Sequence, residues 1–159
     1  MTLQKIKQDP ISLNAHGKRD LRTQFAALCY RIKGGKPEFL LITSRGSGRW
    51  IIPKGWPVDG RTPGESALTE AWEEAGVQGR VIERCIGLFS YHKEIGDTDG
   101  SLPCLALVYP VKVKALARRY PEAGQRRRRW LGRRKAAEKV SDPELARIIR
   151  DFDAARLKG

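Results

Sequence analysis

The sequence has few of the residues that build disulfide or zinc frameworks, and it lacks any long apolar run. Its three cysteines, Cys29, Cys85 and Cys104, are far apart and odd in number. We therefore expect buried free thiols, and neither disulfides nor a zinc site. No run of 18 apolar residues occurs, which excludes a transmembrane helix. Residues 1–10 lack the apolar core of a signal peptide, and this predicts a cytoplasmic protein.

Acidic residues are also scarce. The 159 residues include 31 Lys and Arg against 18 Asp and Glu, which gives a formal net charge of +13. This excess predicts a polyanionic partner, namely nucleic acid, an acidic membrane or a phosphate-rich small molecule, and charge alone does not choose among them. No internal repeat or low-complexity linker divides the chain, so we expect a polar N-terminal arm over residues 1–19 and a single domain over residues 20–159.

One segment contains no lysine or arginine at all, although these residues are abundant elsewhere. It runs from Pro63 to Ala75 and has the features of a helix. Thr62 followed three residues later by Glu65 forms a capping box, and proline suits the first helical position. Gly76 is typical of a helix C-terminus. The pattern therefore predicts a helix over residues 63–75.

The predicted helix has one packing face and one acidic face. Its apolar residues, Ala67, Leu68, Ala71, Trp72 and Ala75, gather on one side. Glu70, Glu73 and Glu74 gather on the other side, at helical spacings of three and four residues. Carboxylates near a helix C-terminus are destabilising, and like charges one turn apart repel. Compensation must come from outside the helix, either from arginines elsewhere in the chain or from a hard divalent cation, Mg²⁺ or Mn²⁺.

The residues before the helix favour the cation. Trp50 to Gly55 form a short apolar strand that runs into a Pro-Lys-Gly turn. Here the chain resembles the Nudix hydrolases, whose box reads Gly, five residues, Glu, seven residues, then Arg-Glu-apolar-any-Glu-Glu-any-Gly-apolar. The residues that match in register are Gly55, Glu70, Glu73, Glu74, Gly76 and Val77. Two positions depart, since Arg61 replaces the first glutamate and Thr69 replaces the arginine. Both members of an opposite-charge pair change together, which indicates an exchanged structural contact.

The resemblance covers residues 22–152 and is nearest to the diphosphoinositol polyphosphate phosphohydrolase type. It implies an α+β fold, an α/β/α sandwich with a mixed sheet, the metal-binding helix after the Pro-Lys-Gly turn and a C-terminal helix. It also implies cleavage of a diphosphate linkage in diphosphoinositol polyphosphates or dinucleoside polyphosphates with Mg²⁺ or Mn²⁺. Glu70 and Glu74 are then the most direct metal ligands, and Glu73 is a further ligand or supports one. A backbone carbonyl near Lys54 or Gly55 supplies another oxygen.

Two further roles follow from the same resemblance. The general base is either Glu70 or an acidic residue of the loop that holds Glu94, Asp97 and Asp99. Substrate phosphates need cations and donors away from the acidic helix, and arginine suits bidentate phosphate contacts. The expected substrate-binding residues are Arg22, Ser44, Arg45, Arg49, Lys54, Gly55, His92 and Lys93. Trp56 could form the floor of the substrate pocket or stack on a base.

The densest positive charge lies at residues 126–135. It comprises Arg126 to Arg129, Arg133, Arg134 and Lys135, around Trp130. This basic run is either a solvated surface or a binding site for a highly phosphorylated ligand or a nucleic-acid backbone. We favour a polyphosphorylated small molecule over nucleic acid, because base stacking usually needs more aromatic residues than the one present. We expect no membrane partner, and the oligomeric state stays open.

Two alternatives to the diphosphohydrolase remain at this point. One is a weakly catalytic Nudix-like binding module for RNA or an anionic metabolite, in which Arg61 and Thr69 mark lost activity. The other is an RNA 5′-end pyrophosphohydrolase.

The remaining patterns predict most of a sheet. Strands are expected over residues 23–32 and 38–43, joined as a hairpin, and at Trp50. An extended strand over residues 77–91, interrupted at Gly87, is expected to pair with residues 105–113, and Trp130 and Leu131 form a last short strand. A second capping box at Ser141 to Glu144 predicts a C-terminal helix.

Overall fold

The computed structural model of the protein describes residues 22–94 and 101–157. In chain order the elements are β1 Thr23–Lys33, β2 Lys36–Thr43, β3 Trp50–Ile51, β4 Lys54–Gly55, α1 Pro63–Ala75, β5 Val77–Val81, β6 Gly87–Glu94, β7 Ser101–Leu116, β8 Arg128–Gly132, α2 Arg133–Lys139, α3 Pro143–Asp151 and the 3₁₀ turn η3 Ala154–Leu157. The expected hairpin is confirmed as β1 and β2, and the last short strand as β8.

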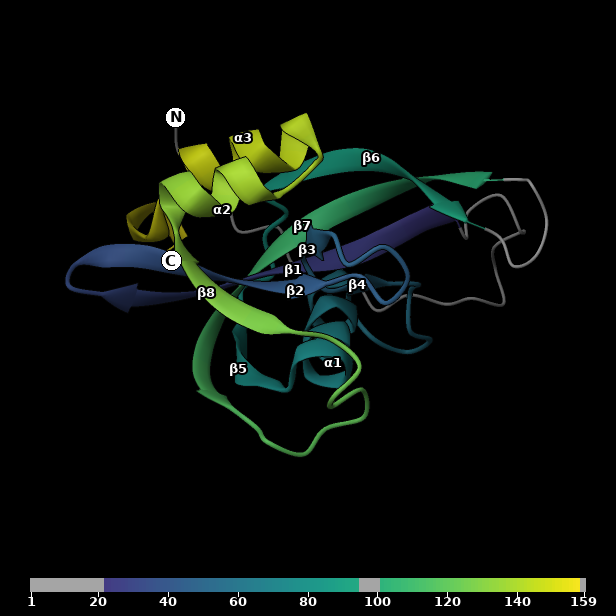
Figure 1. Ribbon diagram of the computed structural model, residues 1–159, viewed down its shortest axis with the longest axis horizontal. Helices are drawn as coiled ribbons and strands as arrows, with labels where there is room; N and C mark the ends of the chain where they lie inside the picture. The colour runs from purple at the N-terminus through teal and green to yellow at the C-terminus, as the bar shows by residue number, and fades with distance from the viewer. Residues whose placement is uncertain (1–21, 95–100, 158–159) are drawn as a thin grey trace.

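A mixed sheet forms the middle layer of the molecule. Its main path is β3-β2-β1-β7-β5, in which β1 and β7 run parallel and the other neighbours are antiparallel. Helix α1 covers one face, and helices α2 and α3 cover the other (Figure 1). Two apolar cores result, one between the sheet and α1 and the other between the sheet and the C-terminal helices. The predicted α+β sandwich with a mixed sheet is confirmed.

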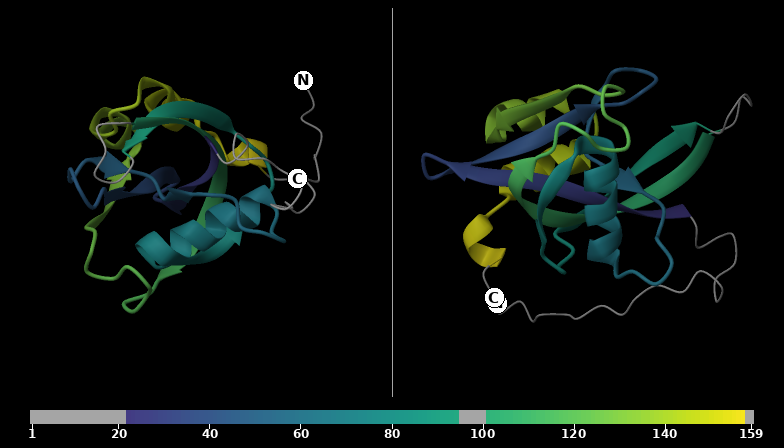
Figure 2. Two further views of the ribbon diagram at one scale, coloured as in Figure 1. Left: turned by 90° about the vertical axis from the view of Figure 1, so that its right-hand side faces the viewer. Right: turned by 90° about the horizontal axis from the view of Figure 1, so that it is seen from below.

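One edge of β1 pairs with both β2 and β4, and one edge of β7 pairs with both β5 and β6. The pairing along β1 determines where the candidate site lies. The C-terminal half of β1 pairs with β2, whereas its N-terminal half pairs with β4 through Phe25–Gly55 and Ala26–Lys54. Strand β4 therefore lies beside α1 at the point where β2 leaves β1. In Figure 2, α1 lies below the curved sheet in the left view and in front of it in the right view, which is seen from below.

The predicted boundaries of α1 are confirmed. The Glu65 N–H donates to Thr62 Oγ1 at 3.1 Å, and the Thr62 N–H donates to Glu65 Oε1 at 2.9 Å. Gly76 ends the helix with a φ of +67°, a left-handed conformation that favours glycine. A second carboxylate, from Glu83, also caps the helix by accepting from the Thr62 hydroxyl and from the Gly64 N–H.

Replacing Glu83 by alanine is expected to lower the free energy of unfolding by about 1–2 kcal/mol, because caps and charges at helix N-termini contribute on this scale. Urea denaturation followed by circular dichroism measures the change. Glu138→Ala is the control, because Glu138 is an exposed residue whose carboxylate pairs with Arg134 one turn away. Equal small losses in the two variants would show that Glu83 does not stabilise the helix.

Two expectations about the sheet and the C-terminal helices need correction, and one helix was not predicted. The expected pairing of residues 77–91 with residues 105–113 is confirmed, but the interruption covers residues 82–86, because β5 pairs with the C-terminal half of β7 and β6 with its N-terminal half. At the C-terminal helix α3, Asp142 is the N-cap residue and makes no side-chain capping bond. The Glu144 carboxylate instead accepts from the Ser90 N–H at 2.9 Å. Helix α2 was not predicted, although Ala136 and Ala137 are buried on its inner side.

The three cysteines are free, as predicted. Cys29 and Cys104 are buried, whereas Cys85 is only half-buried. None of the helices in the described part of the chain has the length and apolar character needed to cross a membrane.

Candidate active site

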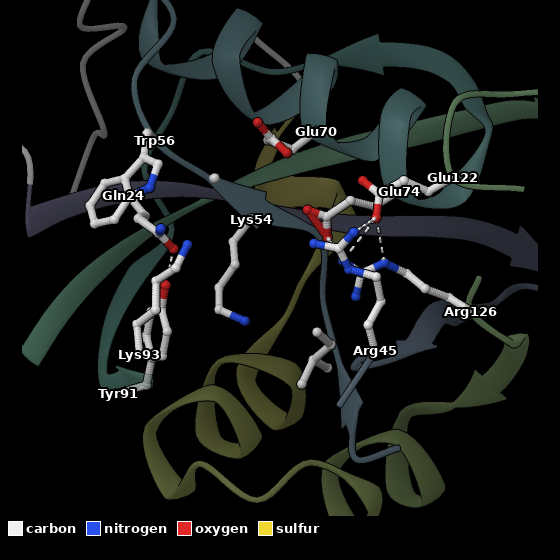
Figure 3. A pocket seen from close by; sticks show the side chains of 12 residues that line it. Gln24, Arg45, Lys54, Trp56, Glu70, Glu74, Tyr91, Lys93, Glu122 and Arg126 are labelled. Atoms are coloured by element: carbon white, nitrogen blue, oxygen red, sulfur yellow. Dashed lines mark hydrogen bonds and ion pairs between the residues drawn. The ribbon is translucent and has the colours of Figure 1, made fainter. Parts of the chain in front are cut away.

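A pocket of about 340 Å³ opens between α1, β4, β6 and the segment that joins β7 to β8. It is lined by Gln24, Arg45, Ile51, Lys54, Gly55, Trp56, Glu70, Glu74, Tyr91, Lys93, Glu122 and Arg126. Figure 3 shows a cluster of carboxylates and guanidinium groups on one side, aromatic rings and Lys93 on the other, and Lys54 between the two. The pocket therefore combines metal-type oxygen ligands with phosphate-type cations.

Glu70 lies directly against the backbone of β4. A Cβ atom at Gly55 would overlap the Glu70 carboxyl group, so only glycine lets the carboxyl group approach the strand this closely. Gly55 does not have a positive φ. Glycine is needed here because a larger residue would collide with the Glu70 carboxyl group. The glycine that opens the predicted box is thus explained by the position of Glu70.

Replacing Gly55 by alanine is expected to weaken Mn²⁺ binding about 10-fold or more, because displaced metal ligands and their supports cost affinity on this scale. The fold is expected to persist, since alanine can adopt the backbone conformation. Equilibrium dialysis of Mn²⁺ measures the affinity, and Gly46→Ala, at a glycine with open space around it, is the control. The same Mn²⁺ affinity in both variants would contradict this role for Gly55.

Burial dominates the electrostatics of the two carboxylates. Desolvation, with the neighbouring charge of Glu74, raises the pKa of Glu70 to about 8. Desolvation also raises the pKa of Glu74, and the charges of Arg126 and Lys54 partly oppose that rise. A pair of carboxyl groups in this setting is stabilised as two anions only by added positive charge. Oxygen donors that need such a charge are suited to a hard divalent cation.

Positive charge reaches the pair from Arg126, a residue whose role the sequence did not indicate. The Arg126 Nη2 atom lies 3.7 Å from Glu74 Oε1 and 3.1 Å from Glu122 Oε1. Glu122, also not predicted, is held over the helix because its N–H donates to the Glu73 carbonyl at 3.0 Å. Arg45 approaches Glu122 at 3.6 Å from the loop after β2. The sequence offered two sources of positive charge for the acidic face, an arginine from elsewhere in the chain or a divalent cation. Arg126 is such an arginine, and it pairs with Glu74, which is also an expected metal ligand.

The two departures from the Nudix box have structural partners. Arg61 pairs with Glu65 one turn along, at 3.7 Å between Nη1 and Oε2. The Thr69 hydroxyl donates to the Glu65 carbonyl at 2.9 Å. Neither Arg61 nor Thr69 lines the pocket. Both residues thus contact Glu65, outside the pocket, and an exchanged contact between Arg61 and Thr69 stays a prediction.

The opposite wall combines two lysines with two aromatic rings. Lys54 Nζ lies 4.6 Å from the centroid of the Tyr91 ring, and Lys93 Nζ lies 4.9 Å from that of Trp56. The Tyr91 hydroxyl donates to Gln24 Oε1. Burial lowers the pKa of Lys54, and the charges of Glu74 and Asp142 partly oppose this shift. An ammonium group held this way has a strong need for an anionic partner.

The structure brings some of the predicted residues together and separates others. Those that line the pocket are Glu70, Glu74, Arg45, Lys54, Gly55 and Lys93. Those that do not line it are Glu73, Arg22, Ser44, Arg49 and His92. Ser44 and Arg49 instead hold the basic loop together, because Ser44 Oγ accepts from the Arg49 N–H at 3.1 Å. Asp97 and Asp99 lie outside the described residues, and the backbone of Glu94 ends β6.

Most arginines of the basic run have internal partners. Arg128 donates to the carbonyls of Ala75 and Ala117 at 2.9 and 3.0 Å, and its guanidinium lies over the Tyr120 ring. Arg133 donates to three carbonyls at the C-terminal end of α3. Arg134 pairs with Glu138. Much of this charge therefore holds secondary-structure elements together.

The carboxylates of the pocket fit a metal ion only in part. Within residues 22–94 and 101–157, no three His, Cys, Asp or Glu side chains form a group that could hold a metal. Glu70 and Glu74 supply two carboxylates beside the β4 backbone, and Mg²⁺ is usually held by one or two carboxylates together with water and substrate phosphates. The residues present therefore fit an ion that shares its coordination with substrate.

The chain is similar to known proteins in sequence and in fold. The family profile described as "NUDIX domain" matches residues 22–152. The chain is 29% identical over 119 residues to Nudix hydrolase 12, mitochondrial, from Arabidopsis thaliana, covering 74% of this chain and 59% of that protein. It is 30% identical over 89 residues to human diphosphoinositol polyphosphate phosphohydrolase 3-alpha, covering 56% of this chain and 54% of that protein. The chain thus spans little more than half the length of these curated relatives.

Solved structures share the fold at lower sequence identity. The Ap4A hydrolase of C. elegans superposes with a TM-score of 0.61 at 22% identity, covering 84% of this chain and 96% of that one. The E. coli dihydroneopterin triphosphate pyrophosphohydrolase gives a TM-score of 0.57 at 16% identity, covering 82% and 94%. These likenesses concern the fold alone.

Proposed function

Because the chain belongs to the Nudix family, we propose that it is a metal-dependent hydrolase that cleaves a diphosphate linkage in a polyphosphorylated small molecule. The substrate is of the diphosphoinositol polyphosphate or dinucleoside polyphosphate type, and the metal is Mg²⁺ or Mn²⁺. Members of the family generally use divalent metals such as Mg²⁺. The observation that carries the proposal is the pair Glu70 and Glu74, set against the Gly55 backbone in a pocket that also contains Lys54.

Each side of the pocket has a role in this chemistry. Glu70 and Glu74 hold the metal, which when bound screens the charge of adjoining phosphates and acidifies a water molecule. Lys54, Lys93 and Arg45 bind and orient the phosphate chain. The general base is Glu70 or Glu122, since both carboxylates line the pocket. Glu73 as a further ligand, and the Glu94 loop as the source of the base, stay predictions.

The alternatives stay hypotheses with less support. Two carboxylates in a cation-lined pocket favour an enzyme over a binding module. The internal partners of Arg126, Arg128 and Arg133 weaken the case for a nucleic-acid surface on the basic run. An RNA 5′-end pyrophosphohydrolase would use the same carboxylates on another substrate. The cytoplasmic location and the division into residues 1–19 and 20–159 also stay predictions.

The test is hydrolysis of a substrate panel with Mg²⁺, Mn²⁺ or EDTA, with the products separated by anion-exchange chromatography. The panel contains a diadenosine polyphosphate, a diphosphoinositol polyphosphate, a nucleoside diphosphate sugar and 5′-triphosphate RNA. We expect turnover of one of the first two classes, abolished by EDTA. Turnover that is confined to the RNA, or that persists in EDTA, would overturn the proposed function, as would a folded protein that hydrolyses none of the four.

A further inference from the structure

The wall opposite the carboxylates offers flat aromatic surface as well as charge. Trp56 and Tyr91 line the same pocket. Tyr91 is fixed through its hydrogen bond to Gln24. Trp56 follows β4 directly, so its backbone is tied to the strand that seats Glu70. Figure 3 shows the indole on the side of the pocket away from Glu74 and Arg126. A ring on this wall would therefore lie across the pocket from that ion-pair cluster.

Among the described residues, two of the four cationic side chains that line the pocket already pair with a carboxylate. The lining residues include four cationic side chains, Arg45, Lys54, Lys93 and Arg126. Both arginines pair with Glu122. The two lysines each rest on an aromatic ring instead. A substrate that carries phosphates all around a saturated ring needs many cations and offers no π face, so it matches this wall poorly.

A short phosphate chain joined to a planar ring matches the same wall well. The phosphates attract the Lys93 ammonium away from the indole, because a desolvated anion is a stronger partner than a ring face. The indole face is then open to an aromatic ring, and such stacking accepts any nucleobase.

From these observations we infer that Trp56, with Lys93, forms a stacking subsite that selects substrates with a planar ring next to the phosphate chain, of the nucleoside polyphosphate class. The inference rests on the proposed function and narrows its substrate. Trp56 is a specificity-determining residue, and Lys93 serves both the ring site and the phosphates.

The test compares Trp56→Ala and Trp56→Phe with the unmodified chain on three substrates. These are diadenosine tetraphosphate, a diphosphoinositol polyphosphate and tripolyphosphate, which has no ring. Since stacking on an aromatic side chain changes affinity about 5- to 150-fold per base, we expect Trp56→Ala to raise KM for diadenosine tetraphosphate about 10-fold or more with kcat little changed. Trp56→Phe is expected to restore most of the loss. The other two substrates are expected to change less than about threefold in either variant.

Two outcomes would overturn the inference. An equal loss on tripolyphosphate would mean that Trp56 supports the fold or the phosphate site, and a larger loss on the diphosphoinositol polyphosphate would mean that it reads another group. If none of the substrates is turned over, the proposed function is wrong, and the stacking subsite is then tested by ligand binding. The methylene analogue of adenosine triphosphate must then bind more weakly to Trp56→Ala than to Trp56→Phe in calorimetry, and equal affinities would also overturn the inference.

Discussion

Replacing Glu74 by glutamine is expected to lower metal-dependent turnover at least about 100-fold, since changes that only disturb the support of metal ligands already cost about 10- to 100-fold. Glutamine has nearly the same shape but removes the negative charge that a divalent cation needs. The fold is expected to survive, because burial already raises the pKa of Glu74 and makes its charged form costly. Substrate hydrolysis at saturating Mg²⁺, with circular dichroism for folding, measures both effects.

The matched control for this variant is Glu138→Gln. Glu138 also lies on a helix and pairs with an arginine, but it is exposed and far from the pocket lining. Its turnover is expected to equal that of the unmodified chain. If Glu74→Gln were as active as the control, Glu74 would not be a metal ligand.

Replacing Arg126 by methionine is expected to lower the stability of the metal-free protein by about 3 kcal/mol, because removing one partner of a buried ion pair leaves the other uncompensated. The side chains of Arg126 and Glu74 are 8% and 7% exposed. For a domain of this size the loss corresponds to a decrease in Tm of roughly 6 to 12 °C. Differential scanning calorimetry in EDTA measures it.

The same variant tests whether Arg126 and the metal ion share the same carboxylates. Arg126 neutralises the carboxylates that we assign to the ion, so adding Mg²⁺ is expected to raise Tm more in Arg126→Met than in the unmodified chain. Arg134→Met is the control, since Arg134 is exposed and pairs with Glu138. An equal Mg²⁺ effect on Arg126→Met and on the unmodified chain would show that the guanidinium and the ion do not share these carboxylates.

The parts of the molecule that the sequence could predict are those whose signals are local. Thr62, Glu65 and Gly76 mark the ends of α1 within a few residues of the chain, and the structure confirms them. The spacing along this helix also places Glu70 and Glu74 on a common face, and both line the pocket. The same spacing does not show that Glu73 is absent from the pocket lining, because the limits of the cavity are set by other elements.

The parts that could not be predicted depend on contacts distant in sequence. Glu122 lies in a segment without any recognisable motif, and Arg126 begins a basic run whose partner the sequence did not indicate. Both reach α1 only because β7 and β8 place their segment over the helix. The division of residues 77–91 into β5 and β6 depends on which half of β7 each strand meets. Helix α2 was hidden because its basic residues outnumber the buried pair Ala136 and Ala137.

Direct Mn²⁺ binding tests the central claim, that Glu70 and Glu74 together hold the catalytic metal. The free-ion signal in electron paramagnetic resonance is followed as Mn²⁺ is added to the unmodified chain and to the double variant Glu70→Gln, Glu74→Gln. We expect saturable binding by the unmodified chain, and an affinity for the double variant at least about 100-fold weaker. Equal Mn²⁺ affinity in the two proteins, with both folded, would contradict the account.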